Sequence, residues 1–81
     1  MTNWYREALE AVGMQGRKNT IRNKLSAVAT QANDETLRAL ASMVIREFEY
    51  SGLNTDHTSL QESNSVNTAE LVKHCKEHAY V

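Results

Sequence analysis

Two histidines and a glutamate near the end of the chain have the spacing of a metal-binding helix. His74, Glu77 and His78 form the pattern H-x-x-E-H. Histidines four residues apart lie on one face of an α-helix, so both imidazoles can bind the same zinc ion, with the carboxylate beside them as a base. The chemistry that such a pattern allows is metal-assisted hydrolysis.

An enzyme of this kind needs more than the pattern, because zinc peptidases with H-x-x-E-H also have a further protein ligand and a walled cleft. The predicted helix at residues 67–79 ends one residue after His78, and 81 residues leave little room for a cleft. His57 is a candidate third ligand, but nothing in the sequence places it beside the pair. We therefore expect two solvated histidines and no catalytic residue, with a metal site at His74 and His78 as the weaker alternative.

The single cysteine lies between these histidines in sequence but points elsewhere. Cys75 is about 100° around the helix from His74, on the apolar side. A reactive thiol needs an exposed, electropositive setting with a base in reach. We therefore expect Cys75 to be a small buried hydrophobic residue.

A second set of candidates is a basic segment at residues 17–24. Residues 11–33 contain no acid and four cations, which are Arg17, Lys18, Arg22 and Lys24. Clustered cations at the start of a helix can contact phosphates, so nucleic-acid or anion binding is one alternative. Four cations are few, however, and the link to the next helix lacks the glycine turn of a helix-turn-helix. The leading interpretation is a solvated helix face, followed by contact with an anionic protein surface.

A third set consists of apolar side chains that the core does not need. Trp4 and Tyr5 are adjacent, so they cannot both point straight into one core, and Met43 lies off the main apolar stripe of its helix. Aromatic and methionine side chains are common anchors of protein interfaces. The predicted protein-binding residues are Trp4, Tyr5, Met43, Tyr50 and Tyr80.

The elements that position these residues are helices. Apolar residues recur at steps of three and four, which predicts an all-α bundle of four helices at residues 3–12, 20–31, 34–50 and 67–79. The first helix has a predicted inner stripe of Tyr5, Leu9 and Val12. The third is the most hydrophobic, and one of its faces carries Leu37, Leu40, Ala41, Val44, Ile45 and Phe48.

The ends of the helices are predicted from capping residues. Thr2 or Asn3, Asn33 and Asn67 are the predicted N-caps of the first, third and fourth helices. Gly13 and Gly52 are the predicted stops of the first and third helices, each followed by an apolar residue that folds back. A polar loop is expected at residues 54–65.

Composition limits the class of protein. Residues 1–81 are enough for one helical domain, and 41% of them are hydrophobic, so the core is thin or is completed by a second copy. A net charge of −1 argues against a strongly basic nucleic-acid binder and against an acidic mimic of nucleic acid. One cysteine permits no internal disulfide, and the chain shows neither a signal pattern nor an apolar run of about 20 residues. We expect a cytoplasmic protein without membrane contact.

These observations favour binding over catalysis. The chain shows no Gly-rich phosphate loop, no CxxC pair and no Ser/His/Asp arrangement, and it implies no cofactor and no small-molecule substrate. The predicted function is that of a small non-enzymatic regulatory or inhibitory protein that binds a protein partner, plausibly as a homodimer. Such proteins are common on phages and other mobile elements, which is the kind of source we expect. The alternatives are a nucleic-acid-associated regulator and a small zinc-binding domain.

Overall fold

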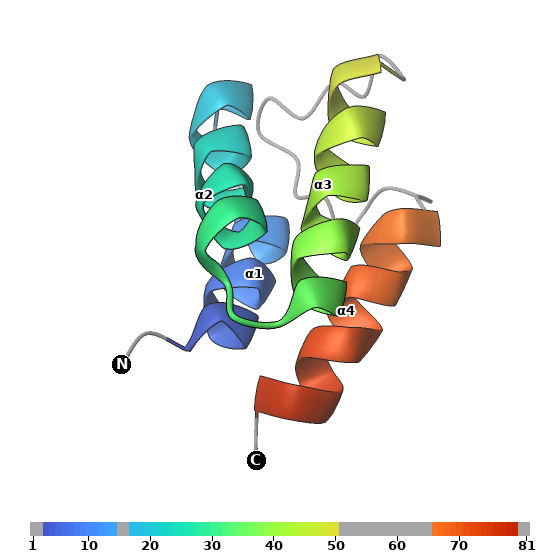
Figure 1. The fold of residues 1–81 in the computed structure, drawn as a ribbon. Helices are drawn as coiled ribbons and strands as arrows, with labels where there is room; N and C mark the ends of the chain where they lie inside the picture. Colours follow the sequence, from blue (N-terminus) through green and yellow to red (C-terminus); the bar gives the residue numbers. More distant parts are fainter. Residues whose placement is uncertain (1–2, 15–16, 51–65, 80–81) are drawn as a thin grey trace.

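The computed structural model describes residues 3–14, 17–50 and 66–79. This part of the chain consists of four helices, and it contains no β-strand: α1 (Trp4–Gly13), α2 (Lys18–Gln31), α3 (Glu35–Tyr50) and α4 (Val66–Ala79) (Figure 1). The predicted all-α bundle is confirmed, and the helix bounds agree with the predicted ones to within two residues. The predicted loop at 54–65 and the predicted stop at Gly52 lie outside the described residues.

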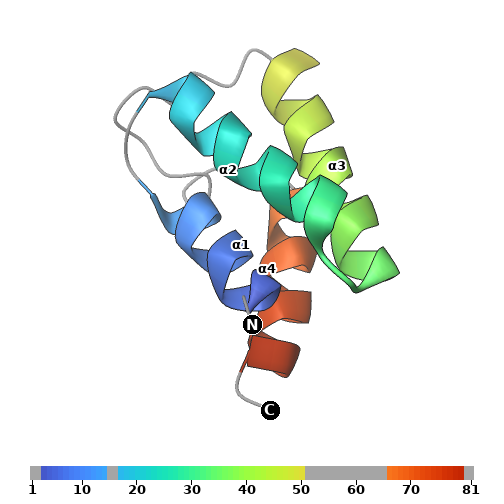
Figure 2. The same cartoon turned by 60° about the vertical axis from the view of Figure 1, so that its left-hand side comes forward.

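Each helix packs against two others. α2 contacts α3 and α1, and α4 contacts α3 and α1, so the four helices enclose one core (Figure 2). The short link between α2 and α3 makes them an antiparallel pair. The starts of α1 and α3 and the end of α4 lie at the same end of the bundle, which is the lower end in Figure 1.

The core is built on the apolar face of α3. Phe48, Leu37 and Val44 are almost completely buried, whereas Leu40 and Ile45 are partly buried at the edges of that face. Among the described residues, the buried apolar ones are Ala8, Ala11, Val12, Ile21, Leu25, Val28, Ala32, Leu37, Ala41, Val44, Phe48, Leu71, Cys75 and Ala79. Every described helix contributes to this set, so no helix is peripheral to the core.

The inner face of α1 differs from the predicted stripe. Ala8, Ala11 and Val12 are fully buried, while Tyr5 and Leu9 are only partly buried. The helix is therefore turned so that its small alanines meet the core. This orientation leaves the hydroxyl of Tyr5 at the edge, within reach of polar groups on other helices.

The N-cap of α3 is Asp34, and the prediction of Asn33 is wrong. Oδ1 of Asp34 accepts hydrogen bonds from the backbone N–H groups of Thr36 (2.9 Å) and Leu37 (3.3 Å). The backbone carbonyl of Asp34 accepts the N–H of Arg38 at 3.0 Å. Aspartate suits this position well because its charge also faces the positive end of the helix dipole.

At the other helix ends, the predicted cap Asn3 is confirmed, and the predictions for Gly13 and Asn67 are wrong. Oδ1 of Asn3 accepts the N–H groups at the start of α1, so Asn3 is the cap of that helix. Gly13 is the last residue of α1 rather than a left-handed stop, because Met14 continues in an extended conformation (φ −73°, ψ 137°). Asn67 lies inside the first turn of α4, since that helix already begins at Val66.

None of the helices in the described residues is both long enough and apolar enough to cross a lipid bilayer.

Candidate functional site

Asp34 joins three parts of the bundle through one carboxylate. Its Oδ2 atom accepts a hydrogen bond from the Tyr5 hydroxyl on α1 at 2.6 Å and lies 2.9 Å from Nε2 of His74 on α4. Its Oδ1 atom caps α3. We name Tyr5, Asp34, His74 and His78 the Asp34 cluster; it occupies the end of the bundle where α1 and α3 begin and α4 ends (Figure 1).

Aromatic contacts hold the rings of the cluster against one another. The Tyr5 ring stacks on His78, with centroids 5.1 Å apart and an interplanar angle of 16°. The two imidazoles lie side by side, with centroids 4.4 Å apart. Nδ1 of His78 lies 2.8 Å from the backbone carbonyl of His74, so it carries the proton and donates it. Nε2 of His78 is then the nitrogen with a free lone pair.

The hydrogen bonds of the cluster lower the pKa of Asp34 and raise the pKa of Tyr5. Donation from Tyr5, followed by donation from His74 and two backbone N–H groups, holds the pKa of Asp34 well below its ordinary value, although partial burial opposes this. The same bond to Asp34, together with desolvation, raises the pKa of Tyr5 to about 12. At neutral pH the cluster therefore contains an ionised carboxylate and a protonated phenol.

The structure brings His74 and His78 together, as their spacing predicts, and adds a residue that the sequence analysis missed. One ligand atom from each of Asp34, His74 and His78 can be chosen so that all three lie within 4.8 Å of one another. His74 is partly buried and His78 is exposed. The only signal for Asp34 in the sequence is its place at a helix start, which says nothing of a histidine 40 residues away. His57 lies outside the described residues.

An open groove runs between α3 and α4, beside the cluster. Its lining residues are Thr36, Leu40, Glu70, Lys73, His74 and Glu77. Glu77, the third residue of the H-x-x-E-H pattern, is exposed on this groove rather than enclosed in a walled cleft. The groove thus offers an accessible surface, with Leu40 as its apolar part.

Both large hydrophobic residues that are exposed in the described part of the chain fall, by helical spacing, on the sides of α3 and α4 that line this groove. Met43 is 44% exposed and Val66 is 72% exposed. Thr36, Leu40 and Met43 share one side of α3, and Val66, Glu70, Lys73 and Glu77 share one side of α4, because residues three and four apart lie together on a helix. We name the surface formed by these seven residues the α3/α4 face.

The predicted protein-binding residues differ in their exposure, and two of them are not described by the structure. Trp4 and Tyr5 are partly buried and pack against the core, and the hydroxyl of Tyr5 is engaged within the chain. Met43 is exposed. The side chain of Tyr50 and the whole of Tyr80 lie outside what the structure describes.

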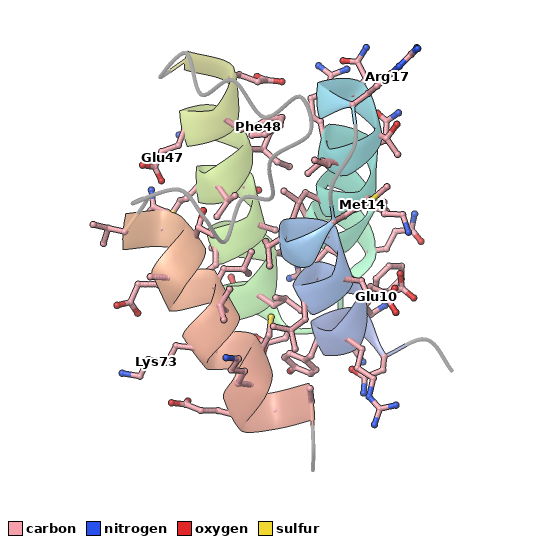
Figure 3. All side chains as sticks on the ribbon, turned by 180° about the vertical axis from the view of Figure 1, so that it is seen from behind. Glu10, Met14, Arg17, Glu47, Phe48 and Lys73 are labelled. Carbon is pink, nitrogen blue, oxygen red and sulfur yellow. The ribbon has the colours of Figure 1, made fainter. Side chains whose placement is uncertain are left out.

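The predicted anion-binding segment is exposed but partly neutralised. Arg17, Arg22 and Lys24 are exposed, while the side chain of Lys18 lies outside the described part. Nη1 of Arg22 pairs with Oε1 of Glu49 at 3.2 Å, which reduces the positive charge that a phosphate would meet. In Figure 3, Arg17 lies on the side of the molecule opposite Glu47 and Lys73, far from the α3/α4 face. Nucleic-acid binding stays a prediction.

Cys75 is fully buried in the core, as its position on the apolar side of the helix predicts. Burial, and to a smaller extent the charge of Asp34, raises the pKa of its thiol to about 11. A buried thiol that stays protonated at neutral pH is a poor nucleophile.

Comparison with known proteins gives no relative: no family model, no curated protein and no solved structure matches this chain. The basis for a function is therefore the geometry of the Asp34 cluster and of the α3/α4 face.

Proposed function

We propose that this chain is a small non-enzymatic regulatory protein that acts by protein–protein binding, and that it forms a homodimer through the α3/α4 face. One observation carries the proposal. The two exposed large hydrophobic residues of the described chain are Met43 and Val66. By helical spacing, Met43 falls on the side of α3 that carries the groove residue Leu40, and Val66 falls on the side of α4 that carries the groove residue Glu70. Scattered exposed apolar residues are normal, whereas their gathering beside a groove is typical of a contact surface.

The charges of this face favour a second copy as the partner. Glu70, Lys73 and Glu77 are exposed and alternate in sign along one side of α4. When two such helices meet in antiparallel orientation about a two-fold axis, Lys73 of each copy can lie opposite Glu70 or Glu77 of the other. One pairing therefore forms twice, which a self-complementary interface requires.

The size of the molecule is also compatible with this interface. The bundle measures 33 × 20 × 18 Å, and α3 and α4 lie side by side along it. A standard interface buries roughly 800 Å² on each partner, with an apolar centre and a polar rim. Leu40, Met43 and Val66 supply the centre, and the charged residues of α4 supply the rim.

Sedimentation equilibrium over a wide concentration range tests the proposal. We expect a monomer–dimer equilibrium for the wild-type chain and a shift toward monomer in Met43→Glu, because a carboxylate would replace the apolar anchor. Ser26→Glu is the matched control: it adds the same charge at an exposed position of α2, away from the α3/α4 face, and should leave the equilibrium unchanged.

Two results would contradict the proposal. One is a wild-type chain that stays strictly monomeric at a protein concentration of ~1 mM. A dimer with a Kd of ~1 mM has a binding free energy of only about 4 kcal/mol, so even a weak dimer would be detected there. The other is a dimer that Met43→Glu and Ser26→Glu weaken equally. Circular dichroism of each variant shows that the helices remain folded.

A further inference from the structure

We propose that Asp34, His74 and His78 form a binding site for a divalent transition-metal ion, with zinc as the representative ion. Sequence spacing supplies only the two histidines. The fold adds the third donor, since the cap of α3 places the Asp34 carboxylate against α4. His74 also lines the groove of the α3/α4 face, whereas Asp34 and His78 do not. Metal uptake and dimerisation are measured by different experiments, so the failure of one proposal can be told from the failure of the other.

The donor set matches the chemistry of such ions. Two imidazoles and one carboxylate are ligands that zinc accepts in tetrahedral sites, where three protein ligands leave a fourth position open. Carboxylate–imidazole sets of this kind also suit Co²⁺ and Fe²⁺, whereas Mg²⁺ and Ca²⁺ prefer oxygen ligands alone. The geometry therefore selects a borderline transition metal over a hard cation.

The distances require only a small movement. The three ligand atoms lie within 4.8 Å of one another. Two ligands on a tetrahedral zinc with bonds of about 2.0–2.1 Å are separated by roughly 3.3 Å. The widest separation between two ligand atoms must therefore shrink by at most about 1.5 Å.

His78 is already oriented in the way that histidine ligands usually are. Metal-binding histidines commonly donate their second ring N–H to a backbone carbonyl or a carboxylate, which fixes the ring and the tautomer. Nδ1 of His78 donates to the carbonyl of His74 at 2.8 Å, so Nε2 keeps its lone pair for a metal. The Tyr5 ring stacks on this imidazole and restricts its rotation further.

His74 and Asp34 now share a hydrogen bond that a metal can replace. The imidazole proton lies on Nε2, 2.9 Å from the Asp34 carboxylate. When a metal ion takes the lone pair of Nε2, the proton that this nitrogen donates to Asp34 moves to Nδ1 of the same ring or leaves to solvent. Tyr5 keeps its hydrogen bond to Asp34 and acts as a positioning residue behind the ligand.

The experiment is calorimetric titration of the full chain with ZnCl₂, together with visible absorption after addition of Co²⁺. We expect one metal ion per chain and the d–d bands of low-coordinate cobalt. His78→Ala and Asp34→Asn should each lower the affinity at least tenfold. Asparagine can still cap α3, so Asp34→Asn tests the carboxylate while the fold is retained. Glu10→Gln, which changes an exposed acid of α1 outside both the cluster and the α3/α4 face, is the matched control and should leave the titration unchanged.

Stability gives a second readout. Zinc should raise the melting temperature of the wild-type chain and leave that of His78→Ala unchanged, because a ligand stabilises the state that binds it. The proposal is overturned if the wild-type chain takes up neither Zn²⁺ nor Co²⁺, in which case the cluster only joins α1, α3 and α4. It is also overturned if Glu10→Gln weakens binding as much as His78→Ala, or if a thiolate-to-cobalt absorption band places the metal on Cys75.

Discussion

The hydroxyl of Tyr5 lies 2.6 Å from Oδ2 of Asp34, across 29 residues of sequence. This contact joins the first turn of α1 to the cap of α3, and the other oxygen of the same carboxylate holds the first N–H groups of α3. Through Asp34, the start of the central helix is tied to α1 and, by His74, to the end of α4. Four predictions about stability follow from the positions of these residues and of the core.

Tyr5→Phe removes the hydroxyl and leaves the ring. We expect it to lower the free energy of unfolding by about 1–2 kcal/mol, because a hydrogen bond to a charged group is lost. A double-mutant cycle with Asp34→Asn isolates the pair, and urea unfolding measures each corner of the cycle. Groups in direct contact usually show a coupling energy of ~0.5–3 kcal/mol, whereas purely additive effects would mean that the two groups do not interact.

The contribution of Asp34 to stability should depend on acid pH. Its pKa is lowered in the folded chain relative to the ordinary value of 3.8, so the folded state favours the carboxylate. The stabilisation is therefore complete above the unfolded pKa and is lost as the pH falls through the folded pKa.

Urea unfolding of the wild-type chain and of Asp34→Asn between about pH 5 and pH 2.5 measures this effect. The difference in unfolding free energy should shrink as the pH falls, because the unfolded chain binds a proton at Asp34 at a higher pH than the folded chain does. The other carboxyl groups are common to both proteins and cancel in the difference. A constant difference across this range would contradict the depressed pKa of Asp34.

Tyr5 should titrate later than an ordinary tyrosine. Its hydrogen bond to Asp34 and its partial desolvation raise the pKa from 10.0 to about 12. The associated stabilisation is fully present below pH 10.0 and is lost as the pH rises through 12. Subtracting the tyrosinate absorbance of Tyr5→Phe from that of the wild type should show almost no ionised Tyr5 at pH 10.0; half ionisation there would show an unperturbed phenol.

A charge in the core should unfold the domain. Val44 is 1% exposed on the inner face of α3. An unpaired carboxylate there costs several kcal/mol, against a total stability of roughly 5 kcal/mol for a domain of this size. Val44→Asp should therefore give no cooperative melt by circular dichroism, whereas Ser42→Asp, at an exposed position of the same helix, should melt close to the wild type.

The period of the apolar residues was sufficient to predict the helices and the buried face of α3. Leu37, Val44 and Phe48 repeat at helical spacing, and helical periodicity depends only on local sequence. The face of α1 was less predictable because Ala8 and Tyr5 both border the apolar side. Which of them meets the core depends on how closely the neighbouring helices approach, and that is a property of the packing.

The candidate metal site was half predictable for the same reason. His74 and His78 are brought together by one helix, so their spacing alone places them side by side. Asp34 reaches them only because α3 and α4 pack with their opposite ends adjacent, and no local pattern encodes that contact (Figure 1). The α3/α4 face likewise exists only after the two helices pack. Met43 could be named from the sequence because it lies off the apolar stripe of its own helix, whereas no such local signal marked Val66.

The proposed homodimer is tested most directly by contacts between copies. In a mixture of isotope-labelled and unlabelled chains, isotope-filtered nuclear Overhauser spectroscopy detects only protons that approach each other across an interface. We expect cross-peaks from the Met43 methyl group of one copy to Val66 or Leu40 of the other. A dimer without such cross-peaks, or cross-peaks confined to α1 and α2, would contradict the assignment of the α3/α4 face as the binding surface.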